Sequence, residues 1–173
     1  MENGAHYYHL DSGGERTNLQ LFALKEAKRT WDGLAKEVLE YGEDVENLKE
    51  RCVLALANLG LSISQLLGQN NPAPEAWVPP PLEILRKFVR HHGLSSDLVV
   101  RFERFNYFYN GCRHFGKTTT GRGYKSVDEL TFTVARECYE FGLEIWSIVI
   151  GVYGRQPDSD LEGFDIENVS EDW

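Results

Sequence analysis

The chain has 173 residues, 42% of them hydrophobic, and a formal net charge of −9. A chain of this length can bury about two-thirds of its unfolded surface in one domain and needs no disulfide staples. It shows no charged and apolar N-terminal leader and no apolar run of about 18 residues, so we expect a soluble, cytoplasmic protein rather than a membrane-spanning one.

Three cysteines, Cys52, Cys112 and Cys138, occur singly within apolar stretches, and no C-x-x-C pair is present. Free cysteines in such surroundings are usually buried, reduced thiols. We therefore predict neither a metal site nor a cofactor.

The charge is unevenly distributed along the chain. In residues 86–125 nine Lys or Arg oppose two acids, a balance of +7. In residues 155–173 seven acids oppose one Arg, a balance of −6. Acidic ends of this kind are usually disordered and solvating, so we expect a disordered acidic tail that keeps the protein soluble. The alternative is that the tail shields the basic middle of the same chain.

The first half of the chain predicts two helices. Residues 1–16 are polar and rich in glycine, as in a flexible arm. From residue 17, apolar residues recur at helical spacing until Gly42, and a second apolar stripe runs from Val45 to Gly68. Glycine after the last periodic residue is a common helix end. The second half of the second stripe is almost entirely apolar, so we expect it to lie at the centre of the fold.

Residues 70–81 hold five of the six prolines and are predicted to form a linker. The segment PLEILRKFVRHHG that begins at residue 81 has proline at its start and glycine at its end, as a short helix does. A serine cap then opens a further predicted helix, in which apolar residues recur every three or four positions from Leu98 to Cys112.

The last predicted helix is the longest. Ser126 and Glu129 match a capping box, and the apolar stripe that follows continues to Gly154. From Phe141 onward this helix is apolar nearly all round, which indicates burial on several sides or a seam between subunits. With five predicted helices and no predicted strand, residues 17–154 are expected to form an all-α bundle.

The segment GCRHFGKT, residues 111–118, matches the phosphate-loop pattern G-x-x-x-x-G-K-[ST]. A phosphate loop needs a buried strand that leads into the glycine-rich turn and a helix that leads away from it. Because the residues before Gly111 have helical spacing, we predict that the match is accidental.

In the helix predicted around residues 98–112, several polar residues fall on one face when successive residues are placed about 100° apart around the helix axis. Arg113 can hold an anion with two hydrogen bonds, and His114 can exchange a proton near neutral pH. We predict an anion-binding or ligand-binding surface that consists of Arg104, Tyr107, Asn110, Arg113, His114, Lys117 and Arg122. The alternative is an ordinary solvated helix face.

Arg86 and His91 form a second pair of interest, with the spacing R-x-x-x-x-H. In one interpretation they cleave RNA, with Arg86 holding the scissile phosphate and His91 moving the 2′-OH proton. In the other, they are cationic residues that interact favourably with the C-terminal end of a helix dipole.

An all-α chain of this size with the segment YNGCRHFGK at residues 109–117 resembles the HEPN (higher eukaryotes and prokaryotes nucleotide-binding) family, and the helical pattern extends the likeness over residues 17–154. The resemblance implies a helical bundle that dimerises and, in active members, cuts RNA without a metal through an R-x(4-6)-H motif. Arg86 with His91 meets that spacing here, whereas positions 107–109, five to seven residues before His114, hold no arginine.

Two functions follow from the resemblance. The first is a non-catalytic or regulatory subunit of a prokaryotic antiviral or toxin–antitoxin assembly, which binds a nucleotide or an effector partner such as a sirtuin-like NADase. The second is a metal-independent endoribonuclease that uses Arg86 with His91, or Arg113 with His114. General RNA binding is a third possibility, and it predicts an affinity that falls steeply with salt. We expect a homo-oligomer or a complex with an effector protein.

Overall fold

The structure is a computed structural model that describes residues 19–69, 81–114 and 125–153. Within these ranges there is no strand, which confirms the predicted all-α fold. The predicted N-terminal arm (1–16) and acidic tail (155–173) lie outside the described residues. The helices are α1 (Leu19–Tyr41), α2 (Leu48–Gln69), α3 (Pro81–His91), α4 (Asp97–Arg113), α5 (Lys125–Glu129) and α6 (Phe132–Tyr153).

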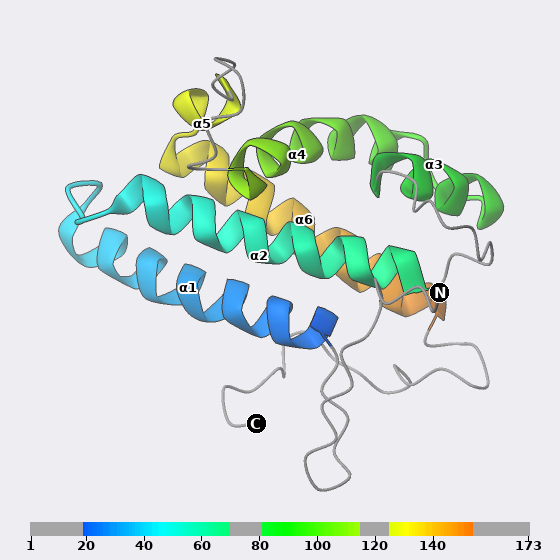
Figure 1. Cartoon of the computed structure of the whole chain (residues 1–173), viewed down its shortest axis with the longest axis horizontal. Helices are drawn as coiled ribbons and strands as arrows, with labels where there is room; N and C mark the ends of the chain where they lie inside the picture. The colour runs from blue at the N-terminus through cyan, green and yellow to red at the C-terminus, as the bar shows by residue number, and fades with distance from the viewer. Residues whose placement is uncertain (1–18, 70–80, 115–124, 154–173) are drawn as a thin grey trace, which may run out of the picture.

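Helix α2 lies at the centre of the bundle, as its apolar second half predicted, and packs against α1, α3, α4 and α6. Figure 1 shows α1 and α2 as an antiparallel hairpin, with α6 behind α2 and with α3 and α4 along the opposite side from α1. The turn of the hairpin uses Gly42 at φ +74° and Asn47 at φ +55°. Both lie in the left-handed region, which glycine and asparagine tolerate best.

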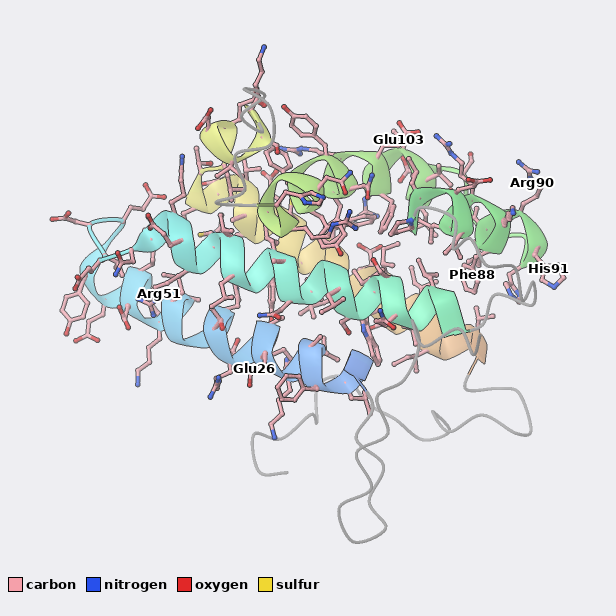
Figure 2. The ribbon with its side chains drawn as sticks, in the orientation of Figure 1. Glu26, Arg51, Phe88, Arg90, His91 and Glu103 are labelled. Carbon is pink, nitrogen blue, oxygen red and sulfur yellow. The ribbon has the colours of Figure 1, made fainter. Side chains whose placement is uncertain are left out.

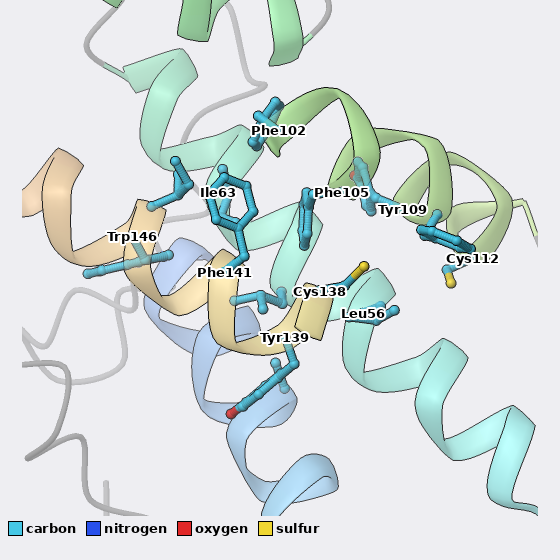
Figure 3. Close-up of a cluster of buried hydrophobic side chains, with 14 of the residues drawn as sticks. Leu56, Ile63, Phe102, Phe105, Tyr109, Cys112, Cys138, Tyr139, Phe141 and Trp146 are labelled. Carbon is cyan, nitrogen blue, oxygen red and sulfur yellow. The ribbon is translucent and has the colours of Figure 1, made fainter. Parts of the chain in front are cut away.

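Two glycines let α4 approach its neighbours closely. A Cβ atom added to Gly60 of α2 would lie 2.0 Å from the ring of Tyr109 in α4. A Cβ added to Gly111 would lie 2.0 Å from the hydroxyl oxygen of Ser126 in α5. The space that a larger residue would fill is therefore occupied by a neighbouring helix, and Figure 3 shows the aromatic side chains that α4 and α6 direct into the shared core.

Helices α3 and α4 follow the prediction closely. Pro81 begins α3, and Gly93 at φ +63° follows its end. The side chain of Ser96 makes no capping hydrogen bond at the start of α4, but the hydroxyl of Ser95 accepts one from the backbone N–H of Asp97 at 3.3 Å.

The predicted start of the last helix is wrong. Ser126 lies within the short helix α5, where it is buried. Helix α5 ends at Glu129, and α6 begins separately at Phe132. The residue that caps α6 is Thr131, whose hydroxyl accepts a hydrogen bond from the backbone N–H of Val134 at 3.2 Å. The described ranges therefore hold six helices instead of the five predicted. Leu130 continues the apolar stripe and is buried in the core, but it lies in the connection between α5 and α6 and belongs to neither helix.

The apolar second half of α6 is used mainly inside the bundle. Its side chains Phe141, Ile145, Trp146, Val149 and Ile150 are buried in the core. The indole N–H of Trp146 donates a 2.6 Å hydrogen bond to the hydroxyl of Ser62 in α2. Burial on several sides, one of the two predicted explanations, thus accounts for this composition. None of the described helices combines the length and the apolar character that crossing a membrane requires.

Candidate functional site

A groove of about 410 Å³ lies between α4 and α6. Its floor consists of the buried side chains of Phe105, Cys138 and Phe141, and its walls are charged. The complete lining is Arg101, Arg104, Phe105, Glu137, Cys138, Glu140, Phe141 and Glu144.

Two ion pairs cross this groove from α4 to α6. Arg101 donates two hydrogen bonds to the carboxylate of Glu144, at 2.6 and 3.0 Å, and its guanidinium lies 4.4 Å from the centre of the Phe141 ring. The hydrogen bond to Glu144 raises the pKa of Arg101 further above its usual value. Arg104 pairs with Glu137 at 3.0 Å. All four side chains are about half exposed, so each pair is weak and can exchange its partner for a group on another molecule.

The groove has one more carboxylate than it has guanidinium groups. Glu140 lines the same groove, is exposed, and pairs with no Lys, Arg or His in the part of the chain that the structure describes. The two arginines therefore face three acids, an excess of one negative charge. A group that enters the groove meets one unmatched carboxylate beside an apolar floor.

The predicted ligand surface is divided among several neighbours. Arg104 faces α6, and the hydroxyl of Tyr107 donates to Glu129 of α5 at 3.2 Å. Asn110 is half-buried, and Arg113 is exposed at the end of α4 beside His114. Lys117 and Arg122 lie outside the described residues. Only Asn110, Arg113 and His114 of the predicted set remain as neighbours on the final turn.

Arg113 and His114 interact with each other. The guanidinium of Arg113 contacts Nε2 of His114 through its Nε at 3.2 Å and its terminal nitrogen at 3.0 Å. Because a guanidinium can only donate, Nε2 of the imidazole is the acceptor in this contact. About two turns earlier on α4, the side-chain oxygen of Asn106 is buried and has no hydrogen-bond partner among the described residues.

The structure does not bring Arg86 and His91 together. Five residues along a helix turn the side chain by about 500°, which leaves the two side chains about 140° apart. Arg86 pairs with Glu103 of α4 at 2.8 Å, whereas His91 contacts the edge of His92 at the end of α3. Figure 2 shows His91 at the tip of α3, well away from Glu103. Burial, together with the nearby His91, lowers the pKa of His92.

Gly111, the first residue of the phosphate-loop match, lies in the last turn of α4 and faces Ser126. The strand that should precede a phosphate loop is absent, because residues 97–113 are helical. The end of the motif, residues 115–118, lies outside the described residues. The helical environment of Gly111 agrees with the prediction that the match is accidental.

The three cysteines are free and buried, as predicted. They come from α2, α4 and α6, and Figure 3 shows Cys112 and Cys138 within the same core. Burial raises the pKa of Cys52 to about 11, of Cys112 to about 12 and of Cys138 to about 11. Thiols with such values are poor nucleophiles at neutral pH. In the described part of the chain, no group of three or more His, Cys, Asp and Glu is placed to hold a metal ion.

Sequence reasoning missed the groove residues on α6. Glu137, Glu140 and Glu144 recur at intervals of three and four, which places them on one helix face, and Arg101 and Arg104 have the same relation on α4. This spacing was the available signal. The charge balance of residues 86–125 concealed it, because the acids that neutralise those arginines lie further along the chain.

Comparisons of the chain with models of protein families, with curated proteins and with solved structures found no match.

Proposed function

We propose that the chain is a non-catalytic binding subunit that docks a partner protein in the groove between α4 and α6. The resemblance to HEPN proteins supplies the setting, a prokaryotic antiviral or toxin–antitoxin assembly in which the partner is an effector such as a sirtuin-like NADase. The proposal gives this partner a lysine or arginine that pairs with Glu140.

The observation that carries the proposal is the composition of the groove. Its ion pairs are half exposed and exchangeable, and Glu140 is an acid without a partner among the described residues. A partner that supplies a cation there corrects the excess negative charge, and the apolar floor adds contact area. Electrostatic complementarity of this kind selects partners and speeds their association.

The outer surface of α4 extends the same interface. Val100 is 64% exposed and Tyr107 is 45% exposed. With Arg104 between them, they follow the spacing i, i+4, i+7, which places all three on one face. Tyrosine and arginine are enriched at the centres of protein interfaces. The proposal thus gives the predicted residues Arg104 and Tyr107 a binding role as parts of a protein interface.

The positions of the catalytic candidates also favour a non-catalytic role. Arg86 pairs with Glu103 and points about 140° away from His91 around α3, so the two side chains are not directed at one phosphate in this arrangement.

The binding role is tested with proteins encoded by neighbouring genes. Each is co-expressed with this chain, and complexes are separated by gel filtration and measured by titration calorimetry. We expect Glu140→Lys to weaken a complex by at least about tenfold, because it places a cation against the partner's cation. Glu46→Lys is the matched control, since Glu46 is exposed in the connection between α1 and α2, away from the groove. Equal affinities of the two variants would refute the groove as the docking site.

A metal-independent endoribonuclease is the second candidate. The closeness of Arg113 and His114 favours it, since a guanidinium that can hold phosphate lies beside an imidazole that can take a proton on Nε2 once Arg113 releases that nitrogen to bind the phosphate. The assay incubates the purified full chain with tRNA in EDTA, beside His114→Ala and His91→Ala. We expect no cleavage from any of them. Cleavage that disappears in His114→Ala would establish the nuclease instead.

A further inference from the structure

The outward face of α3 has the highest net charge of the described helices. Three cations, Arg86, Lys87 and Arg90, oppose one acid, Glu83, giving α3 a charge of +2. Arg86 pairs with Glu103, but Lys87 and Arg90 pair with no acid in the described ranges. Figure 2 shows Arg90 and His91 projecting from the C-terminal end of α3. The opposite face of α3 is buried in the core, so these cations are held on a fixed helix.

This end of α3 lies at the end of the bundle where α6 finishes. The pairs Arg101–Glu144 and Arg104–Glu137 show that α4 and α6 are antiparallel, so α4 begins where α6 ends. Only residues 92–96 separate the end of α3 from the start of α4. Figure 1 shows the last turns of α3 and α6 at the same end of the molecule.

The chain beyond α6 carries the complementary charge. Residues 155–173 hold seven acids against one Arg, a balance of −6. When extended, these residues span about 60 Å, which exceeds the length of α6, about 33 Å. The segment is therefore long enough to contact several faces of the bundle, and its length does not decide which one it binds. Charge does select one, because the groove face of α6 keeps an excess of one negative charge at Glu140 after its two ion pairs, whereas α3 carries a charge of +2.

We infer that the acidic segment 155–173 docks on the cationic face of α3 in the same molecule, with Lys87 and Arg90 as its main contacts. Helix α1 does not compete, since its four cations are balanced by four acids. The same charge difference that directs the segment away from α6 leaves the groove between α4 and α6 accessible. The inference does not depend on the proposed function, because it concerns a different face of the bundle.

The test is carbodiimide crosslinking of the full chain, which joins a carboxylate to a nearby lysine amine, followed by peptide mass spectrometry. Lys36 on α1 is the control lysine, since it is also exposed but belongs to a helix with no net charge. We expect Lys87 to give roughly threefold or more crosslinks to residues 158–172 than Lys36 does, in product that runs at the monomer mass. We also expect this excess to disappear in about 0.5 M NaCl, which screens exposed charges.

A charge variant completes the experiment. Arg90→Glu reverses the charge beside Lys87 while leaving the lysine itself available, and it should reduce the Lys87 crosslinks roughly threefold without changing those of Lys36. Circular dichroism confirms that the variant remains helical. The inference is overturned if Lys87 and Lys36 crosslink equally, if Arg90→Glu has no effect, or if the Lys87 crosslinks occur only in product of dimer mass.

Discussion

Replacing Gly60 by alanine should destabilise the protein, although alanine normally strengthens a helix. The added Cβ would lie 2.0 Å from Cδ2 and 2.3 Å from Cε2 of Tyr109, whereas carbon atoms normally keep about 3.5 Å apart. Tyr109 is only 2% exposed and packs on Phe105, so its ring has little freedom to move aside. Overpacking of this severity costs about 3 kcal/mol, and the helix gains about 1 kcal/mol, which leaves a net loss of about 2 kcal/mol.

Gly33→Ala in α1 is the matched control. The nearest atom to its added Cβ is a guanidinium nitrogen of Arg51 at 3.9 Å, an ordinary contact. This variant should therefore gain about 1 kcal/mol, so that the two alanine variants differ by about 3 kcal/mol. Urea unfolding followed by far-UV circular dichroism measures both. If Gly60→Ala proves as stable as Gly33→Ala, α2 and α4 do not approach as closely as described, and the position of α4 beside the groove is wrong as well.

Two further predictions concern titratable groups. Arg51 donates to both carboxylate oxygens of Glu37, at 2.7 and 3.0 Å, and this hydrogen bonding lowers the pKa of Glu37 below its usual 4.5. The pair therefore contributes stability above that pH and loses it as the pH falls through the lowered pKa. Urea titrations should show Glu37→Gln less stable than the parent protein near neutral pH, with a difference that shrinks as the pH falls below 4.5, and a difference that stays constant into acid would contradict the assignment. The buried thiols should react with Ellman's reagent at about pH 8 at least about a hundredfold more slowly in the native protein than in urea, since their raised pKa values leave little thiolate. Rapid labelling of the native protein would show that at least one thiol is accessible.

Periodicity in the sequence predicted the first four helices because each has a continuous apolar stripe and an identifiable end. It failed at the last helix because Leu130 continues the stripe while the backbone does not continue the helix. Ser126 and Glu129 match a capping box, yet Ser126 is needed in the core, where it packs against Gly111. The hydroxyl of Thr131 was the real signal, and its spacing to Val134 was visible in the sequence.

The candidate site was less accessible to sequence reasoning than the fold. Arg104 was predicted to bind a ligand, but its partner Glu137 lies 33 positions further along the chain, and only the packing of α4 against α6 brings the two together. Counting charges within a window treats each cation as available. In this bundle the arginines of α4 that face α6 are balanced across the groove, and the unmatched group is an acid.

The packing of α6 against α2 brings together residues that are far apart in the sequence, and this affects how the chain is made. Leu59 and Ser62 of α2 contact Gly142 and Trp146, which are synthesised more than 80 residues later. A ribosome that adds about 5–20 residues per second takes several seconds to cover that interval. During this time the side of α2 that α6 will cover stays exposed to solvent, and its apolar side chains can bind chaperones. A stall in translation before Phe132 would therefore leave this protein prone to aggregation.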